Sequence, residues 1–440
     1  MSKFKRYERY KDSGIEWIGE IPEEWTSLKV SWIFNIIGSG TTPFSSNLDY
    51  YDGDIPWVNT GDLNDDYLYK TSKMVTDLAL NECSALKFYP INTLLIAMYG
   101  ATIGKLSITK IVATTNQACC ALAQPKKASI KFIFYWFLAN RDHIISMAYG
   151  GGQPNISQNL IKSLRIPLPE KHEQKAIANF LDQKTTEIDA LIADKEKLIE
   201  LLREKRQAII SEAVTKGLNP NVRMKDSGIE WVGEIPEHWD IRRIKYLSNI
   251  RNVKASDSDN DKIYVGLESI EPKTGKLLTN NNDEQQAVGE TANIFRKGDV
   301  LFGKLRPYLA KCIVADFNGR CTSELLVLRT ASDMLPEYLY LFMLSPIFID
   351  VVNSSTYGAK MPRVSWDFIG NLKIPLPNIK EQEEIVEYLI KLTNNMDDLI
   401  SDISTQIQKL KEYRQSLISE AVTGKIDVRE LENMSEVIYE

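Results

Sequence analysis

Apolar side chains recur at a helical spacing in two stretches of the chain. Stepping by alternating four and three residues through 177–209 meets seven apolar side chains in ten positions, and through 385–417 it meets nine apolar or aromatic ones. This is the 3.5-residue period of helices that pack along one another over several turns. We predict two long helices of equal length that bury each other, against the alternative that each covers only its neighbouring domain.

Start and stop signals flank both stretches at aligned places. A side-chain oxygen can cap the free N–H groups at a helix start, and glycine commonly follows a helix end. About 30 residues separate cap from stop, which is roughly 45 Å of helix. The signals are Thr186 with Asp189 and then Gly217 in the first stretch, and Asn394 with Asp397 and then Gly424 in the second.

The regions before these helices, 26–162 and 240–370, have a different pattern. Short β-type runs are broken by Gly, Asn and Asp, and each region closes with one aromatic-rich helix, near 130–147 and near 338–352. The predicted fold class is α+β, with two mixed α/β domains and two long helices. The β-type runs are TLLIAMYG (93–100), ACCALA (118–123), DVLFG (299–303) and ELLVL (324–328).

The whole plan occurs twice. KDSGIEWIGEIPEEW at 11–25 returns as KDSGIEWVGEIPEHW at 225–239, with thirteen of fifteen positions identical and an offset of 214. The IPLP block and the helix after it return with an offset of 208, which predicts a pseudo-two-fold internal repeat. The predicted segments are a first domain with its marker (1–163), a central helical region (164–224), a second domain with the repeated marker (225–371) and a C-terminal helical region (372–440).

The charge is unevenly distributed. The net charge of the chain is −6, yet 26–162 carries +2 and 240–371 carries +1, whereas 372–440 alone carries −6. Neutral-to-basic domains joined to an acidic helix fit a chain that touches a polyanion with one part and something else with the rest. An average solvated domain has a similar balance, so both interpretations stay open.

Few motifs of catalysis are present. The five cysteines form no C-x-x-C pair and the three histidines lie far apart, so neither a disulfide framework nor a sequence-local zinc site is expected. GATIGKL at Gly100 and GSGTTP at Gly38 depart from the phosphate-binding and dinucleotide-binding loops. Carboxylates are plentiful and the sequence alone cannot pair them, so a buried acid/base dyad stays open. No cleavable signal opens the chain and its apolar runs are too short to cross a bilayer, so we expect a cytoplasmic protein.

The repeated motifs together resemble the specificity subunit of bacterial Type I restriction-modification systems. The resemblance rests on SGIEWIGEIPEEW, on IPLP-x3-EQ, and on RQ-x2-ISEAVT at both helix ends. TTPFSSNLDYYDGDIPWVNTGDL (41–63) resembles the opening of one kind of target recognition domain in that family, and GLESIEPKTGKL (266–277) with KGDVLFGKLRPYLAK (297–311) resembles another. The likeness covers nearly the whole chain.

This resemblance implies a non-catalytic subunit that binds double-stranded DNA, with two recognition domains separated by two long antiparallel helices. Each domain would read one half of a bipartite target. Two methyltransferase subunits would dock on the helical region, and two restriction/translocase subunits would join through them. No cofactor or metal is expected in this chain, because the partners would hold S-adenosylmethionine, ATP and Mg and methylate flipped adenines. The expected subunit contacts, at the helix ends, are Arg206, Glu212, Arg414 and Glu420.

Candidate DNA-binding residues lie in glycine-rich loops and turns. The loops at 148–157 and 356–365 let backbone approach closely, and the turns GSGTTP and GKLRPY offer hydroxyls and cations to phosphates or base edges. Each loop could instead merely link a helix to the IPLP block, and Arg306 could be a structural arginine paired inside its domain. The candidates are Thr41, Thr42, Lys105, Gln153, Asn155, Ser157, Lys304, Arg306, Lys360 and Arg363.

Two rival functions remain at this point. One is an interaction scaffold whose domains bind protein, and the other is an enzyme with an unrecognised site. S-adenosylmethionine or ATP turnover by the purified chain alone would favour the enzyme.

A longer first helix should change the spacing of the DNA target. If the paired helices set the distance between the half-sites, at roughly 10 bp between centres, then inserting turns within 187–216 should alter the gap and leave both halves unchanged. Mapping of methylated adenines measures the gap directly. An unchanged gap would contradict the idea that the helices act as a spacer.

Overall fold

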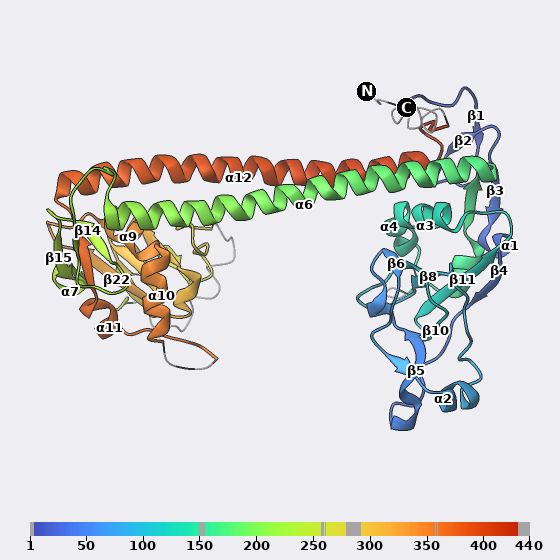
Figure 1. The fold of residues 1–440 in the computed structure, drawn as a ribbon, viewed down its shortest axis with the longest axis horizontal. Helices are drawn as coiled ribbons and strands as arrows, with labels where there is room; N and C mark the ends of the chain where they lie inside the picture. Colours follow the sequence, from blue (N-terminus) through green and yellow to red (C-terminus); the bar gives the residue numbers. More distant parts are fainter. Residues whose placement is uncertain are drawn as a thin grey trace. The chain divides into compact units, whose positions relative to one another are not determined.

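The computed structural model describes residues 4–148, 155–256, 259, 261–278, 292–356, 358 and 360–429. The chain divides into two compact units, Met1–Asp194 with Gln406–Glu440, and Lys195–Thr405. The division cuts the two long helices, α6 (Lys171–Lys216) and α12 (Ile379–Val422), so each unit holds part of both (Figure 1). Within the described ranges, no helix has both the length and the apolar character needed to span a bilayer.

Both long helices start earlier than the sequence signals indicate. They have 46 and 44 residues, or about 69 and 66 Å at 1.5 Å per residue. The predicted caps Thr186 and Asn394 are therefore wrong, because both lie inside helices. The turns before them bury Leu181 and Leu389 completely, and burial of this kind overrides a local cap signal.

The two helices lie beside each other in each unit. In the first unit Arg414 Nε lies 2.9 Å from Asp189 Oδ1. In the second, Arg206 Nε lies 3.8 Å from Asp397 Oδ1, and Gly217, directly after the end of α6, lies against Glu381, near the start of α12. The helices therefore run antiparallel there, as predicted, and the two ion pairs are related by the offset of 208.

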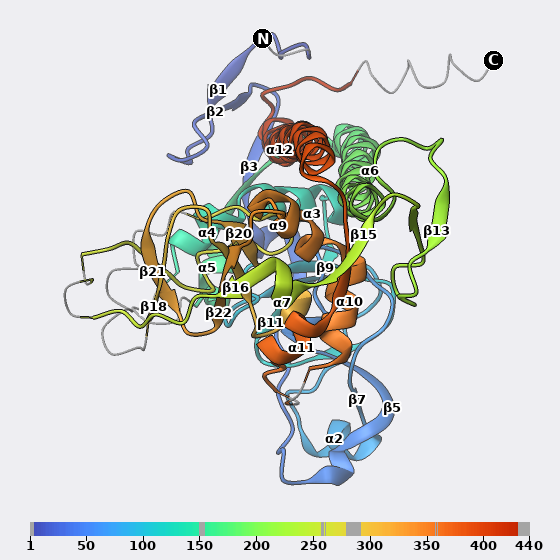
Figure 2. The ribbon, with the colours of Figure 1, turned by 90° about the vertical axis from the view of Figure 1, so that its left-hand side faces the viewer.

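The first unit packs helix α3 (Ile130–Ala139) against strand β9 of a five-stranded sheet with the order β4-β11-β8-β9-β6. A smaller sheet, β10-β5-β7, and helix α2 (Asp77–Glu82) form the end of the domain farthest from α6 (Figures 1 and 2). The strands are β4 (Phe34–Gly38), β5 (Tyr51–Val58), β6 (Asp66–Leu68), β7 (Met74–Val75), β8 (Leu94–Ala97), β9 (Leu106–Thr109), β10 (Thr114–Thr115) and β11 (Cys119–Pro125). The marker forms a hairpin of β1 (Tyr10–Asp12) and β2 (Glu20–Pro22), and the short helices are α1 (Val30–Ile33), α4 (Arg141–Ser146) and α5 (Gln158–Ser163).

The second unit repeats this plan with a four-stranded sheet, β16-β22-β19-β20, and a three-stranded one, β17-β21-β18. Register is kept: Ala97 of β8 pairs with Cys119, and Gly303 of β19 pairs with Leu325, each 206 residues further on. The strands are β13 (Met224–Asp226), β14 (Glu234–Pro236), β16 (Ser248–Ile250), β17 (Tyr264–Val265), β18 (Ala292–Phe295), β19 (Val300–Gly303), β20 (Cys312–Val314), β21 (Gly319–Thr322) and β22 (Leu325–Thr330). The helices are α7 (Ile244–Leu247), α9 (Pro336–Leu344), α10 (Pro346–Ser354) and α11 (Trp366–Asn371).

The four predicted β-type runs are confirmed as β8, β11, β19 and β22, but the single aromatic helix predicted in each domain is two helices. Asn140 ends α3 and donates its side-chain N–H to the Trp136 carbonyl at 2.8 Å. In the second unit Pro346 follows α9, and proline has no N–H to continue a helix.

Each domain begins and ends on one two-stranded sheet. Strand β3 (Thr26–Lys29) pairs with β12 (Arg165–Leu168), and β15 (Asp240–Arg243) pairs with β23 (Lys373–Leu376). Both second strands belong to the IPLP block. The chain therefore leaves each domain beside the point where it entered.

A buried glutamine fastens each long helix to its domain. Gln174 accepts a hydrogen bond from Ser129 N (2.6 Å) and donates to the carbonyls of Lys127 (3.2 Å) and Pro169 (2.9 Å). The Gln174 side chain is almost fully buried, as is that of Gln382 in the second unit. Gln382 has the same three bonds, each at 2.9 Å, to Leu335 N and to the carbonyls of Asp333 and Pro377. This explains why a glutamine stands at the end of the IPLP-x3-EQ motif in both copies.

The tryptophans of the two markers pack inside their units. Trp25 and Trp239 are buried, and Trp17 and Trp231 lie against aromatic rings of α3 and α9. Trp25 Nε1 donates to Glu173 at 3.1 Å, a bond that Trp239 Nε1 lacks among the described residues.

Removing either glutamine side chain should destabilise its unit. Gln174→Ala or Gln382→Ala leaves one N–H and two carbonyls without their partner, which should lower the free energy of unfolding by about 2 kcal/mol. Urea denaturation measures the loss. Gln183→Ala, at an exposed position of α6, is the control and should change the unfolding free energy by less than about 0.5 kcal/mol. An equal effect of all three substitutions would contradict this role.

Candidate nucleic-acid interface

Two segments singled out separately in the sequence meet in the second unit. The turn after β19 contacts the stretch before α11: Arg306 N donates to the Pro362 carbonyl at 2.7 Å, and Val364 N donates to the Lys304 carbonyl at 3.0 Å. A bridge between Leu305 and Arg363 lies between these two bonds. The GKLRPY turn and residues 360–365 thus lie side by side and form one surface.

The turn has an unusual backbone that the first domain shares. Arg306 and Ala310 have φ values of 52° and 46°, a left-handed conformation that costs non-glycine residues free energy. The residues at the same places after β8 are Gly100 and Gly104, with φ values of 86° and 77°. The two domains therefore keep the same turn, and the second keeps it with a long cationic side chain where the first has glycine.

The contact between turn and loop is repeated as well. In the first unit Ile156 N donates to the Met98 carbonyl at 2.8 Å, and these residues correspond to Val364 and Lys304. Met98 N in turn donates to the carbonyl of Ala118 at 2.8 Å. Ala118 is next to Gln117, whose side chain accepts from the Thr42 hydroxyl at 2.6 Å. The GSGTTP turn therefore borders the same surface.

Cationic side chains lie on this surface of the second domain, together with an exposed tyrosine and an exposed methionine. Arg306 and Lys360 are exposed and Lys304 is half-buried, and they are accompanied by Tyr308 (44% exposed) and Met361 (53% exposed). Cationic side chains neutralise phosphates, and aromatic rings can stack on bases. The side chains of this surface are therefore of the kinds that bind a polyanion whose aromatic bases are accessible.

Arg363 and Arg306 have different environments. The Arg363 guanidinium donates two hydrogen bonds of 3.2 Å to the Glu324 carboxylate, so the internally paired arginine of this surface is Arg363. Arg306, for which an internal pairing was the alternative, has an exposed side chain.

The candidate residues of the first domain also divide into residues that are exposed and residues that make internal hydrogen bonds. Lys105 and Asn155 are exposed, whereas the Ser157 side chain caps α5 by accepting from Leu160 N at 3.1 Å. The carbonyl of Thr41 accepts from Trp57 Nε1 at 3.1 Å. Gln153 lies outside the described residues. The Ser157 side chain and the Thr41 carbonyl thus make internal hydrogen bonds, whereas the residues Lys105, Asn155 and Thr42 are exposed.

Gln117, Tyr308 and Met361 also belong to this surface and were not singled out from the sequence. Tyr308 and Met361 stand inside motifs already identified, next to the cations chosen there. The signal that could have found the shared turn is the alignment of TLLIAMYGATIGK with DVLFGKLRPYLAK at an offset of 206. That alignment places Gly100 against Arg306.

The predicted subunit contacts at the helix ends are not equivalent. Arg206 is buried and donates to the carbonyls of Lys273 (2.9 Å) and Thr274 (3.4 Å) in its own unit, so the structure gives it an internal role. Arg414 is paired with Asp189 and is more exposed. Glu212 is exposed, and Glu420 accepts from the Ser416 hydroxyl at 3.0 Å.

Catalytic chemistry has little support elsewhere in the described residues. No group of three or more His, Cys, Asp or Glu side chains there could hold a metal ion. Burial raises the pKa of Cys119, Cys120 and Cys321 to about 12, which leaves these thiols protonated and poorly nucleophilic at neutral pH.

Comparison with known proteins agrees with this repeated architecture. The family described as "Type I restriction modification DNA specificity domain" matches residues 22–201 and 236–409. Relatives include the Type I restriction enzyme MjaIX specificity subunit of Methanocaldococcus jannaschii, 25% identical over 98% of this chain and 99% of the relative. The EcoKI specificity subunit of Escherichia coli is 23% identical over 93% and 90%.

Solved structures share the fold. A chain from a study of complex assembly and conformational transition of the type I R-M system superposes with a TM-score of 0.71 at 15% identity, covering 92% of this chain and 99% of the other. The HsdS subunit from Thermoanaerobacter tengcongensis gives a TM-score of 0.55 at 15% identity, over 92% and 98%. With two family matches spanning both of its domains, the chain belongs to the Type I restriction-modification DNA specificity family.

Proposed function

We propose that this chain is the DNA-reading subunit of a Type I restriction-modification complex and that each domain reads one half of a bipartite target with the surface described above. The observation that carries the proposal is the turn and loop contact repeated in both units. Its backbone geometry is the same in the two domains while its side chains differ. A repeated frame with different side chains suits two half-sites of different sequence.

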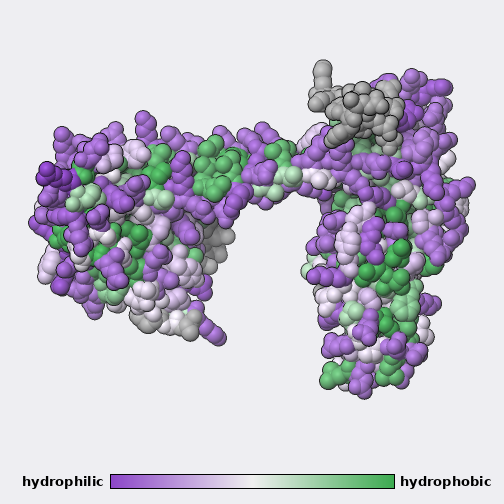
Figure 3. Space-filling view, in the orientation of Figure 1, coloured by the Kyte–Doolittle hydropathy of each residue, from purple (hydrophilic) through white to green (hydrophobic). Residues whose placement is uncertain are grey.

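The long helices supply a second kind of surface, which we assign to the methyltransferase subunits. Figure 3 shows hydrophobic residues, in green, exposed over α6 and α12. Exposed apolar groups of this kind typically mark a protein interface. The exposed large apolar or aromatic side chains of these helices are Leu191 and Tyr413 in the first unit, and Leu198, Leu201, Tyr388, Ile390 and Leu399 in the second. Because the helices are repeated, two methyltransferase subunits can dock in equivalent ways, and restriction subunits would join through them.

Catalysis in this scheme belongs to the partners. They would hold S-adenosylmethionine, ATP and Mg, and this chain would bring them to the target without a cofactor of its own. The scaffold alternative, in which the domains bind protein, predicts no sequence-selective DNA binding. A gel shift of the chain with its methyltransferase partner and random-sequence competitor DNA separates the two proposals.

Replacing the exposed cations of the second domain should weaken DNA binding. Arg306→Ala should cost about 1–3 kcal/mol if the guanidinium reads a base, and Lys360→Ala should lower the salt dependence by about one released ion if its ammonium binds a phosphate. Binding titrations at several salt concentrations measure both. Lys197→Ala is the control, since Lys197 pairs with Glu200 on the same helix. Unchanged affinity in both variants, with normal folding, would contradict this surface.

Exchange of one domain should change one half of the target. Residues 240–370 start and end beside the sheet of β15 and β23, so the corresponding domain of another such chain can be joined there without strain. Mapping of methylated adenines should then show a new sequence in one half and the original in the other. A change in both halves would contradict independent reading.

A further inference from the structure

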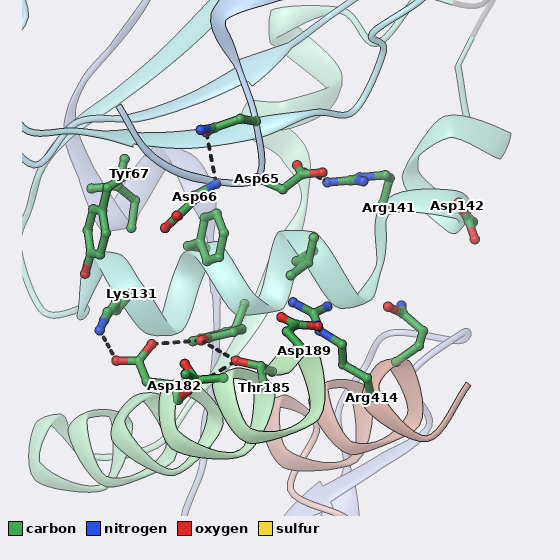
Figure 4. Close-up of a pocket in the computed structure, with 17 residues that line it drawn as sticks. Asp65, Asp66, Tyr67, Lys131, Arg141, Asp142, Asp182, Thr185, Asp189 and Arg414 are labelled. Atoms are coloured by element: carbon green, nitrogen blue, oxygen red, sulfur yellow. Dashed lines mark hydrogen bonds and ion pairs between the residues drawn. The ribbon is translucent and has the colours of Figure 1, made fainter. Parts of the chain in front are cut away.

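The first unit contains a polar cleft with no role in the surface described above. Its volume is about 810 Å³, and it lies between the recognition domain and the adjoining parts of α6 and α12 (Figure 4). Five carboxylates line it against three cations. The carboxylates are those of Asp65, Asp66, Asp142, Asp182 and Asp189, and the cations are Lys131, Arg141 and Arg414.

The second unit fills the corresponding place with a segment of its own chain. Residues 271–276 present the carbonyls of Lys273 and Thr274 to the Arg206 guanidinium, and the Tyr340 hydroxyl also donates to Thr274 O, at 3.1 Å. Lys276 Nζ then lies 2.9 Å from Asp397 Oδ2. An arginine of the helix pair thus binds two main-chain carbonyls of this turn, and an aspartate of the helix pair binds its lysine ammonium group.

The same arginine and aspartate occur in the first unit. Arg414 and Asp189 of the first unit correspond to Arg206 and Asp397 of the second, at an offset of 208. The filled pair is buried, with side chains 7% and 14% exposed, whereas the side chains of Arg414 and Asp189 are 28% and 52% exposed. Among the residues that the structure describes, no segment covers Arg414 as 271–276 covers Arg206.

The first domain cannot fill the cleft with its own equivalent segment. Val58 ends β5 as Val265 ends β17, so the stretch after β5 carries Asp66 where the second domain carries Lys273, and Tyr69 where it carries Lys276. Asp65 pairs with Arg141, and Lys131 pairs with Asp182, which also accepts from the Tyr135 hydroxyl at 2.7 Å. These pairs leave a carboxylate excess on the walls, and no lysine among the described residues pairs with Asp189.

We propose that this cleft binds a lysine-bearing turn of a partner protein, in the way that the second unit binds residues 271–276. The lysine ammonium would lie beside Asp189, and main-chain carbonyls of the turn would accept from Arg414. A nucleic-acid strand is disfavoured, because phosphates would face the carboxylate excess. The bound turn would fasten the first domain to the helix pair, as the internal segment does in the second unit.

The segment 269–278 itself is a suitable probe. It is a closed hairpin, with Leu278 N donating to Ser269 O at 2.7 Å and Glu271 N donating to Lys276 O at 2.9 Å. Its ends are therefore close enough for head-to-tail cyclisation. The test measures fluorescence anisotropy of the labelled cyclic peptide on titration with the full-length chain.

Wild-type protein should bind the peptide saturably, and Asp189→Asn should weaken binding at least fivefold. Glutamine in place of the peptide lysine that corresponds to Lys276 should weaken it to a similar degree. Glu187→Gln removes one negative charge from the same helix outside the cleft and should leave binding unchanged. Thr186→Arg, at an exposed helix position lining the cleft, should block binding even if Asp189→Asn disturbs folding.

Three results would overturn the proposal. They are the absence of saturable binding to wild type, equal weakening by Glu187→Gln, and displacement of the peptide by spermidine at the same concentration as by unlabelled peptide. The last would mean that the cleft takes any polyamine. Sequence-selective DNA binding should survive Asp189→Asn and Thr186→Arg, so failure of this inference is distinguishable from failure of DNA reading.

Discussion

The architecture depends on a buried amide at the start of each long helix. Gln174 and Gln382 each satisfy one N–H and two carbonyls from the loop before the aromatic helix and from the IPLP strand. Such groups cannot be left unpaired in a protein interior without a large penalty. Strand, loop and helix are therefore held in one arrangement, and the direction in which each long helix leaves its domain is fixed within the first turn.

Duplication has conserved main-chain contacts more strictly than side chains. The bonds of Met98 with Ile156 and of Lys304 with Val364 are the same, although none of these residue types matches. The helix ion pairs are the same residues in both copies, yet one pair is covered by its own chain and the other is open. The repeat thus gives both units the same main-chain contacts. The functions of the two units differ where their side chains or covering segments differ.

Most of the frame could be predicted from periodicity and repeats. The 3.5-residue pattern identified both helices, and the offset of 208 related them, because each depends on local spacing alone. The helix starts were missed, since Thr186 gives a valid local signal that burial of Leu181 overrides. The meeting of Arg306 with Pro362 depends on a contact across 56 residues, and the pairing of Arg363 with Glu324 depends on one across 39. Chemistry of that kind has no signature in a single sequence.

The left-handed backbone at Arg306 restricts which amino acids can stand there. Glycine, which the first domain has at Gly100, adopts φ near +86° freely, and unbranched residues tolerate such values at a modest cost, whereas valine, isoleucine and threonine clash with their own backbone. Fewer than twenty amino acids are therefore compatible with the backbone at this position. Diversification there favours glycine, asparagine, aspartate or an unbranched side chain.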